Sequence, residues 1–76
     1  MKELLLYIAR SLVDNPDEVT VTERQENAET VLELRVAEGD MGKVIGRQGR
    51  IAKDIRALVK SLAQRDGIRV SVEIVD

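Results

Sequence analysis

The sequence has no cysteine and no histidine. The absence of cysteine excludes a disulfide framework and thiolate metal sites, and the absence of histidine removes the commonest general base and metal ligand. The serines therefore have no histidine to activate them as nucleophiles. Asp14, Asp17 and Glu18 are close in sequence, but nothing supplies a convergent set of ligands around them, so we interpret them as a solvated helix end. We predict no enzymatic activity, no metal site and no cofactor.

Aromatic residues and long apolar runs are scarce as well. Tyr7 is the only aromatic residue, whereas proteins that bind single-stranded nucleic acid without sequence preference often stack bases on aromatic rings. The longest apolar run, residues 4–9, is far short of the ~20 residues that span a bilayer. The N-terminus also has too short an apolar stretch for a signal peptide. We therefore expect a cytoplasmic protein without a membrane segment.

Length and composition indicate one small domain. The chain has 76 residues, of which 43% are hydrophobic and 34% charged, and we expect residues 1–76 to fold as a single globular domain. A core of this size rarely contributes more than about 3–5 kcal/mol of stability. Self-association or binding to a partner protein is therefore expected.

Charge is distributed unevenly along the chain. The net charge is only −2, but residues 40–65 contain seven cations and two anions, a local charge of +5, and the remaining residues carry −7. A basic segment on an acidic body attracts an anionic partner to one side of the molecule. A helix with mixed charges on its solvent face would give the same pattern, so charge alone leaves both interpretations open.

Hydrophobic periodicity predicts three elements in the first half of the chain. Residues 2–13 have the spacing of an amphipathic helix, with Leu5, Ile8 and Leu12 on one face, and the helix should stop before Pro16. Residues 18–24 alternate valine with threonine, as expected of a half-buried strand. A loop near residues 25–29 leads to a second alternating segment over residues 30–37. These two strands should form an antiparallel hairpin.

The sequence pattern in the second half of the chain predicts two helices and a strand. Asp40 is placed to cap a short helix over residues 41–45. Residues 50–64 form an amphipathic helix, and Gly67 suits the left-handed conformation that ends many helices. Residues 68–75 alternate cleanly as a third strand. The main apolar stripe of the long helix consists of Ile51, Ile55, Leu58 and Leu62, and its apolar surface is widened by Ala52, Val59 and Ala63.

The predicted element order is therefore α-β-β-α-α-β. Strands with one apolar face and helices with one apolar stripe pack as a two-layer α+β structure. The two helices between the last two strands form a crossover long enough to make those strands parallel. We expect a mixed three-stranded sheet covered on one face by three helices.

The stretch VIGRQGRI, residues 44–51, joins the two helices of the crossover. Gly46 and Gly49 permit positive φ and let an anionic backbone approach the peptide groups closely. The helix that begins at Arg50 presents free N–H groups toward the turn, and Arg47 and Lys53 add positive charge. The spacing fits neither a dinucleotide-binding nor a triphosphate-binding glycine loop. A purely structural joint between helices would also use glycine, so spacing alone leaves that alternative open.

VIGRQGRI matches the signature of KH domains, an IGxxG motif between apolar residues. Together with the element order and the length, it makes the chain similar to the KhpA family of stand-alone bacterial type II KH proteins, over essentially the whole sequence. The resemblance implies binding of single-stranded RNA in a groove between the GXXG loop at residues 46–49, its two helices and an edge strand, where KH domains clamp about four nucleotides. The RNA-binding residues implied by it are Ile45, Gly46, Arg47, Gln48, Gly49, Arg50, Ile51 and Lys53, with Lys43 and Arg56 as an additional basic rim.

The same resemblance implies a wider role. It implies an RNA chaperone that works with a KhpB-like KH-containing partner and is linked to cell-wall homeostasis and cell shape. A homodimer is also expected, and the run Leu4–Ile8 is either core or a dimer contact. The alternative hypothesis is a protein–protein adaptor on a KH scaffold, in which the turn is structural. Nothing in the residues distinguishes RNA from single-stranded DNA.

Overall fold

The computed structural model of the protein describes residues 1–75. The order α-β-β-α-α-β confirms the predicted α+β arrangement of a type II KH domain. Single turns of 3-10 helix precede β1, precede α2 and occupy the GRQG turn. The main elements are α1 (Lys2–Leu12), β1 (Thr20–Glu26), β2 (Glu29–Arg35), α2 (Met41–Ile45), α3 (Arg50–Arg65) and β3 (Val70–Ile74), and the 3-10 turns are η1 (Pro16–Glu18), η2 (Glu38–Asp40) and η3 (Arg47–Gly49).

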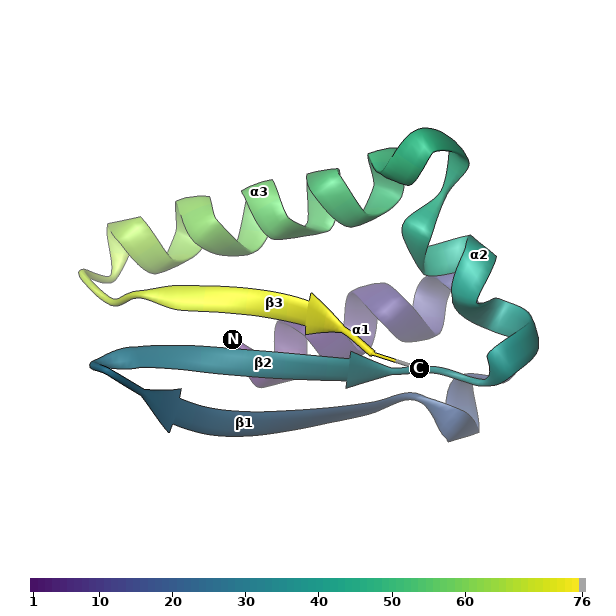
Figure 1. The fold of residues 1–76 in the computed structure, drawn as a ribbon, viewed down its shortest axis with the longest axis horizontal. Helices are drawn as coiled ribbons and strands as arrows, with labels where there is room; N and C mark the ends of the chain where they lie inside the picture. Colours follow the sequence, from purple (N-terminus) through teal and green to yellow (C-terminus); the bar gives the residue numbers. More distant parts are fainter. Residues whose placement is uncertain (76) are drawn as a thin grey trace.

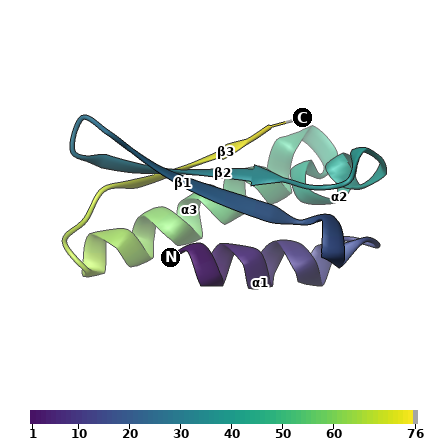
Figure 2. The same cartoon turned by 90° about the horizontal axis from the view of Figure 1, so that it is seen from below.

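The sheet has the order β1-β2-β3, with β1 and β2 antiparallel and β2 and β3 parallel. Both pairings are as predicted. Figure 1 shows α3 running beside β3, with α2 and the GRQG turn at one end of the molecule. Figure 2 shows α1 and α3 on the same side of the sheet, so the other sheet face is left open. β3 pairs with β2 along one edge only, and its other edge, the free edge of β3, lies next to α3 in Figure 1.

The hairpin between β1 and β2 is tighter than the predicted loop over residues 25–29. The strands pair as far as Glu26 and Glu29, which leaves a turn of two residues. Asn27 and Ala28 both have positive φ, 53° and 65°. This is the geometry of a type I′ turn, whose twist matches that of the flanking strands. Because alanine rarely adopts positive φ, the sequence carried no clear signal for this turn.

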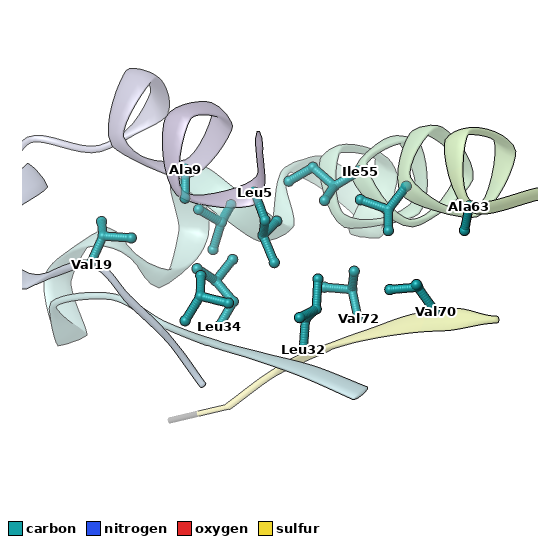
Figure 3. Packing of buried hydrophobic residues seen from close by; sticks show 12 residues of the cluster. Leu5, Ala9, Val19, Leu32, Leu34, Ile55, Ala63, Val70 and Val72 are labelled. Atoms are coloured by element: carbon teal, nitrogen blue, oxygen red, sulfur yellow. The ribbon is translucent and has the colours of Figure 1, made fainter. Parts of the chain in front are cut away.

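The core lies between the sheet and the helices. In Figure 3, Leu5 and Ala9 of α1 and Ile55 of α3 point toward Leu34 and Val72 of the sheet. These five residues are at most 6% exposed and belong to one continuous cluster. Helices α1 and α3 are therefore held against the same apolar sheet face.

The buried stripe of α3 differs from the predicted one. Leu58 was expected in the core but is 45% exposed, and Ile51 and Leu62 are only half-buried. Of the predicted stripe, only Ile55 is buried. The small residues that the sequence placed beside the stripe face the sheet instead, because they allow the helix to approach it closely. The observed core stripe consists of Ala52, Ile55, Val59 and Ala63.

The buried stripe of α1 is displaced as well. Leu5 and Ala9 are fully buried, and Ile8 is only half-buried. Leu12 is 37% exposed, so the predicted position of Leu12 on the core face was wrong. The helix ends there, one residue before the predicted boundary.

The end of α3 confirms the role predicted for Gly67. Its φ is 71°, its N–H donates to the carbonyl of Gln64 at 3.1 Å, and the N–H of Ile68 donates to the carbonyl of Ala63 at 3.0 Å. This pair of bonds is the Schellman motif, which ends a helix and reverses the chain. Ile68 was predicted to face the core from β3, but it lies in this turn and is 48% exposed. The strand begins only at Val70.

The observed core stripe of α3 predicts that alanine substitutions of Ile55 and Leu58, which are similar in size, change the stability by different amounts. We expect Ile55→Ala to lower the free energy of unfolding by about 2–5 kcal/mol, because it leaves a cavity in the core. Leu58→Ala should cost less than about 1 kcal/mol, because the side chain is largely exposed. Urea unfolding of both variants measures the difference. Equal losses would contradict the assignment of the core face.

Asp40 does not cap α2 with its side chain, contrary to the prediction. It is 2% exposed, and its carboxylate accepts hydrogen bonds from the backbone N–H of Asp14 (3.3 Å), the backbone N–H of Asn15 (3.0 Å) and the Asn15 side chain (3.1 Å). A capping residue has an extended backbone, whereas Asp40 ends the turn η2 with φ −101° and ψ −4°. The carboxylate therefore ties the connection after α1 to the base of α2.

This arrangement predicts a pH-dependent stability. Burial raises the pKa of the Asp40 carboxyl, but the hydrogen bonds from Asn15 and Asp14 and the charge of Lys43 outweigh burial and lower the pKa below its ordinary value of 3.8. A carboxyl with a lower pKa in the folded state stabilises the fold above its unfolded pKa, and this stability is lost as the pH falls through the folded value. We expect the free energy of unfolding to fall below pH 3.8, and Asp40→Asn to weaken that dependence.

Urea unfolding at a series of pH values measures the effect. Asp40→Asn should also be less stable than wild type at neutral pH, because a neutral amide accepts these hydrogen bonds less strongly. The control is Asp54→Asn, which removes the same charge from an exposed position on α3. Identical pH profiles for Asp40→Asn and wild type would contradict the role given to the buried carboxylate.

Candidate nucleic-acid interface

The GRQG turn reverses the chain between α2 and α3 with three of its four residues at positive φ. Gly46 has φ 76° and ψ 174°, Gln48 has φ 58° and ψ 25°, and Gly49 has φ 74° and ψ 14°. The Gly46 conformation is open essentially only to glycine. The positive φ of Gln48 was not predicted, because glutamine gives no signal for it.

The two glycines serve different physical needs. A Cβ on Gly46 would lie 2.6 Å from Cγ1 of Ile51, so this position has no room for a side chain. A Cβ on Gly49 would meet nothing within 4 Å, so glycine is needed there only for its backbone conformation. Ile51 is half-buried against the core and anchors the turn, whereas Ile45 is 37% exposed.

The turn leaves backbone N–H groups free at its tip. The N–H of Gly49 donates to the Gly46 carbonyl at 3.1 Å, and the N–H of Arg50 donates to the Arg47 carbonyl. Among the hydrogen bonds formed within residues 1–75, none uses the N–H of Arg47 or Gln48. A helical residue followed by a left-handed one makes a concave anion-binding arrangement of such groups. No side chain of the described residues caps the start of α3, so no side chain neutralises the positive end of its helix dipole, which favours an anion beside the turn.

Cations surround this tip. Arg47, Arg50 and Lys53 are exposed, and the ion pairs observed in residues 1–75 involve none of them. Lys43 lies elsewhere: its Nζ is 3.3 Å from Asp14 Oδ2. An exposed pair of this kind contributes little to stability. Of the five predicted cations, Arg47, Arg50 and Lys53 thus lie in the turn or in the first turn of α3, whereas Lys43 pairs with the connection after α1.

Arg56 reaches from α3 to the free edge of β3. Its Nε donates to the Val72 carbonyl at 3.2 Å. On the other side of the strand, Thr30 N–H binds the Arg69 carbonyl and Val75 N–H binds the Leu34 carbonyl. Alternate residues of a parallel strand face opposite neighbours, so the backbone groups of Val72 point to the free edge. Arg56 thus lies beside the strand that the KH resemblance implicates in RNA binding.

The flank of α3 that carries Arg56 holds two polar residues that were not among the predicted site. Lys60 and Gln64 follow Arg56 at intervals of four residues and lie on the same flank of the helix. Both line a hollow beside Val70. The spacing of Lys53, Arg56 and Lys60 is visible in the sequence, but it points to a surface only when the face that packs on the sheet is known.

A cluster of three acidic side chains around Arg24 lies on the open face of the sheet, away from α3. Glu33 and Glu73 are neighbours in the β2–β3 register, and Arg24 forms ion pairs with both, as well as with Glu26 at 3.2 Å. Because Leu34 and Val72 point into the core, the side chains of Glu33 and Glu73 next to them in the strands point to the opposite face of the sheet. Three acidic residues, together with Arg24 and Arg35 that pair with them, thus lie on the face of the sheet opposite to the helices that carry the basic segment.

The part of the chain that the structure describes contains neither a metal-binding cluster nor a helix that could cross a membrane. No group of three or more carboxylates in residues 1–75 could hold a metal ion. No helix within the same range is long and apolar enough to cross a membrane.

Comparison with known proteins identifies the family. The family model for the KhpA/KhpB KH domain matches residues 2–74. The chain belongs to this family. The RNA-binding protein KhpA of Clostridium acetobutylicum is 57% identical over 75 residues, which cover 99% of this chain and 100% of that protein. KhpA of Chlamydia trachomatis serovar D is 50% identical over 76 residues, with coverage of 100% and 97%. The predicted resemblance to the KhpA family is confirmed.

A solved structure supports the fold independently. Aquifex aeolicus Era, in a crystal structure with bound GDP and AlF4−, superposes with a TM-score of 0.65 over 96% of this chain and 28% of the Era chain. The sequence identity is 22%, so this likeness shows the fold alone. Part of the Era chain thus has the same arrangement of helices and strands as Figure 1 shows for this chain.

The different surroundings of the two glycines give a testable difference. We expect Gly46→Ala to destabilise the fold by about 1–3 kcal/mol through backbone strain alone, because alanine is forced into a conformation that suits only glycine. The clash of the new Cβ with Ile51 should add to this loss. Gly49→Ala should cost about 1–2 kcal/mol, the penalty of a left-handed alanine alone. Chemical unfolding measures both losses, with Gly39→Ala as a control at a position that has open space and no positive φ. A Gly49→Ala variant less stable than Gly46→Ala would contradict the assigned contacts.

Proposed function

We propose that this protein binds single-stranded RNA through the GRQG turn and the first two turns of α3, as far as Arg56, without catalysing a reaction. The observation that carries the proposal is the pair of open N–H groups of Arg47 and Gln48 at a tip surrounded by exposed cations. Phosphate oxygens match this arrangement, since they accept hydrogen bonds and carry negative charge. The naming of its close relatives as RNA-binding proteins supports RNA as the ligand.

In this proposal the residues of the turn have separate roles. The open N–H groups of Arg47 and Gln48 bind phosphate oxygens, and Gly46 and Gly49 keep the approach to them clear. Ile45 offers an exposed apolar surface to a base, whereas Ile51 holds the turn on the core. The cations Arg50, Lys53 and Arg56 neutralise the following phosphates, and Lys43 contributes at longer range.

The proposed cellular role is that of an RNA chaperone. Sugar-phosphate contacts hold RNA largely without reading its sequence, which suits an RNA chaperone of the cytoplasm. The small core and the single aromatic residue favour modest affinity per domain, so a dimer or a KhpB-like partner would add avidity. The link to cell-wall homeostasis and cell shape belongs to this proposal through the family alone.

A protein–protein adaptor is the second candidate. The observations in its favour are the net charge of −2 and the exposed apolar residues Leu58 and Tyr7, which are 45% and 72% exposed on the helical layer. Under this alternative the GRQG turn is only a joint, and RNA affinity does not depend on it.

The two functions are separated by Arg47→Asp/Gln48→Asp. Both side chains are exposed, so the fold should persist, while two carboxylates replace groups that would face phosphates. We expect wild type to bind a short single-stranded RNA with a log–log salt slope of about −0.7 per phosphate neutralised, and the variant to lose at least tenfold in affinity. Fluorescence anisotropy at several salt concentrations measures both.

The control is Lys2→Asp/Arg10→Asp on α1, which changes the charge more strongly at exposed positions outside the turn. Circular dichroism must show that both variants are folded. Unchanged RNA affinity in the folded turn variant would reject the GRQG turn as the binding site and favour the adaptor.

A further inference from the structure

A hollow lined by residues of α3 and β3 lies at the end of α3 opposite the GRQG turn. Figure 1 shows the two elements that border it. Its volume is about 420 Å³, within the range of roughly 300–1,000 Å³ that is usual for pockets that hold small molecules. Most of its lining is polar or exposed, and the residues concerned are Glu29, Lys60, Gln64, Ile68, Arg69 and Ser71.

The hollow is a consequence of how α3 ends. The Schellman turn brings Ile68 and Arg69 back onto the sheet within four residues of the last residue of the helix. Val70 then starts β3 beside Ala63 and Gln64. Because the helix and the strand diverge from this turn, the surface between them stays open. The hollow is bordered by Lys60 and Gln64, which lie on the same flank of α3 as Arg56.

The chemistry of the lining suits a nucleotide. Lys60 and Arg69 take part in no ion pair within residues 1–75, so both remain available to a phosphate. The amide of Gln64 can donate to and accept from a base edge. Ile68, 48% exposed, offers an apolar surface to the face of a base. Glu29, which accepts a hydrogen bond from Ser71 Oγ at 3.3 Å, can accept one from an exocyclic amino group.

The backbone of β3 adds further recognition groups. Residues 69 and 75 bond to β2, so Val70 and Val72 present their N–H and carbonyl groups at the free edge. The Val72 carbonyl accepts a hydrogen bond from Arg56 Nε. Among residues 1–75, no side chain donates a hydrogen bond to the Val70 carbonyl, so this group is available to a ligand. A base in the hollow would therefore meet main-chain groups that can bind it.

A row of cations along α3 connects the hollow to the proposed binding site, but the hollow lies at some distance from that site. Lys53, Arg56 and Lys60 share one flank of α3. With a rise of 1.5 Å per residue, Lys60 is about 16 Å and Gln64 about 22 Å along the helix from Gly49. Four stacked nucleotides at about 3.4 Å each cover roughly 14 Å, which ends before the hollow. A strand that follows the cations reaches it with nucleotides beyond those four.

We propose that this hollow is a second subsite, which holds a further nucleotide of the RNA strand gripped at the GRQG turn. The inference rests on the proposed function, because it needs the strand to be held at the turn. It adds that the binding site extends along the full length of α3 and that affinity grows with RNA length.

The test is a length series of fluorescently labelled oligoadenylates of four, six, eight and ten nucleotides, because adenine carries the exocyclic amino group that Glu29 would bind. Wild type should gain about tenfold in affinity between four and ten nucleotides at about 0.1 M salt, since two more phosphates are neutralised. Lys60→Ala/Arg69→Ala should bind the four-nucleotide probe like wild type and lose this gain. The salt slope for the ten-nucleotide probe should fall by about 1.4 in the variant.

Two further variants separate a local subsite from a general charge effect. Gln64→Ala/Ile68→Ala changes no charge and should still reduce the length-dependent gain. Lys2→Ala/Arg10→Ala removes two charges from α1 and should preserve it. Equal affinity of wild type for all probe lengths, or a full gain in the Lys60→Ala/Arg69→Ala variant, would overturn the subsite while leaving the GRQG site intact. Failure of wild type to bind any probe would instead overturn the proposed function.

Discussion

The close packing of α3 on the sheet is the interaction on which the rest of the molecule depends. The buried residues Ala52, Ile55, Val59 and Ala63 occur at intervals of three and four, and each is followed directly by a polar residue: Lys53, Arg56, Lys60 or Gln64. Successive helical residues are turned by about 100° around the axis. Once the small apolar residues face the sheet, the polar ones must face the free edge of β3. The packing of the core thus fixes where the cations lie.

The GRQG turn depends on the same packing. Ile51 is held at the margin of the core and comes so close to Gly46 that a side chain there would collide with it. The chain can pass this contact only in a conformation that glycine adopts. The backbone that emerges leaves the N–H groups of Arg47 and Gln48 without partners among residues 1–75. The anion-binding character of the tip is therefore a property of the backbone, set by steric contact beneath it.

Segregation of charge lets an acidic protein offer a basic surface. The net charge of −2 would repel nucleic acid if it were spread evenly, and at physiological salt charges interact only over about 8 Å. The acidic cluster around Arg24 lies on the sheet face opposite to the core residues Leu34 and Val72, while the cations of the turn and of α3 belong to the helical layer. Local charge rather than net charge then governs what each face can bind.

Local signals along the chain were enough to predict the element order, the strand pairing, the end of α3 at Gly67 and the family. These signals are the period of the apolar residues, a glycine at a helix end, and a short motif with its flanking residues. Packing between distant segments decided which stripe of α3 faces the core, where the Asp40 carboxylate finds its partners, and the tight turn at Asn27 and Ala28. Apolar residues cover more than one face of α3, and Asp40 bonds to residues about 25 positions away in sequence. Locally these choices are equivalent, so only the assembled tertiary structure could select among them.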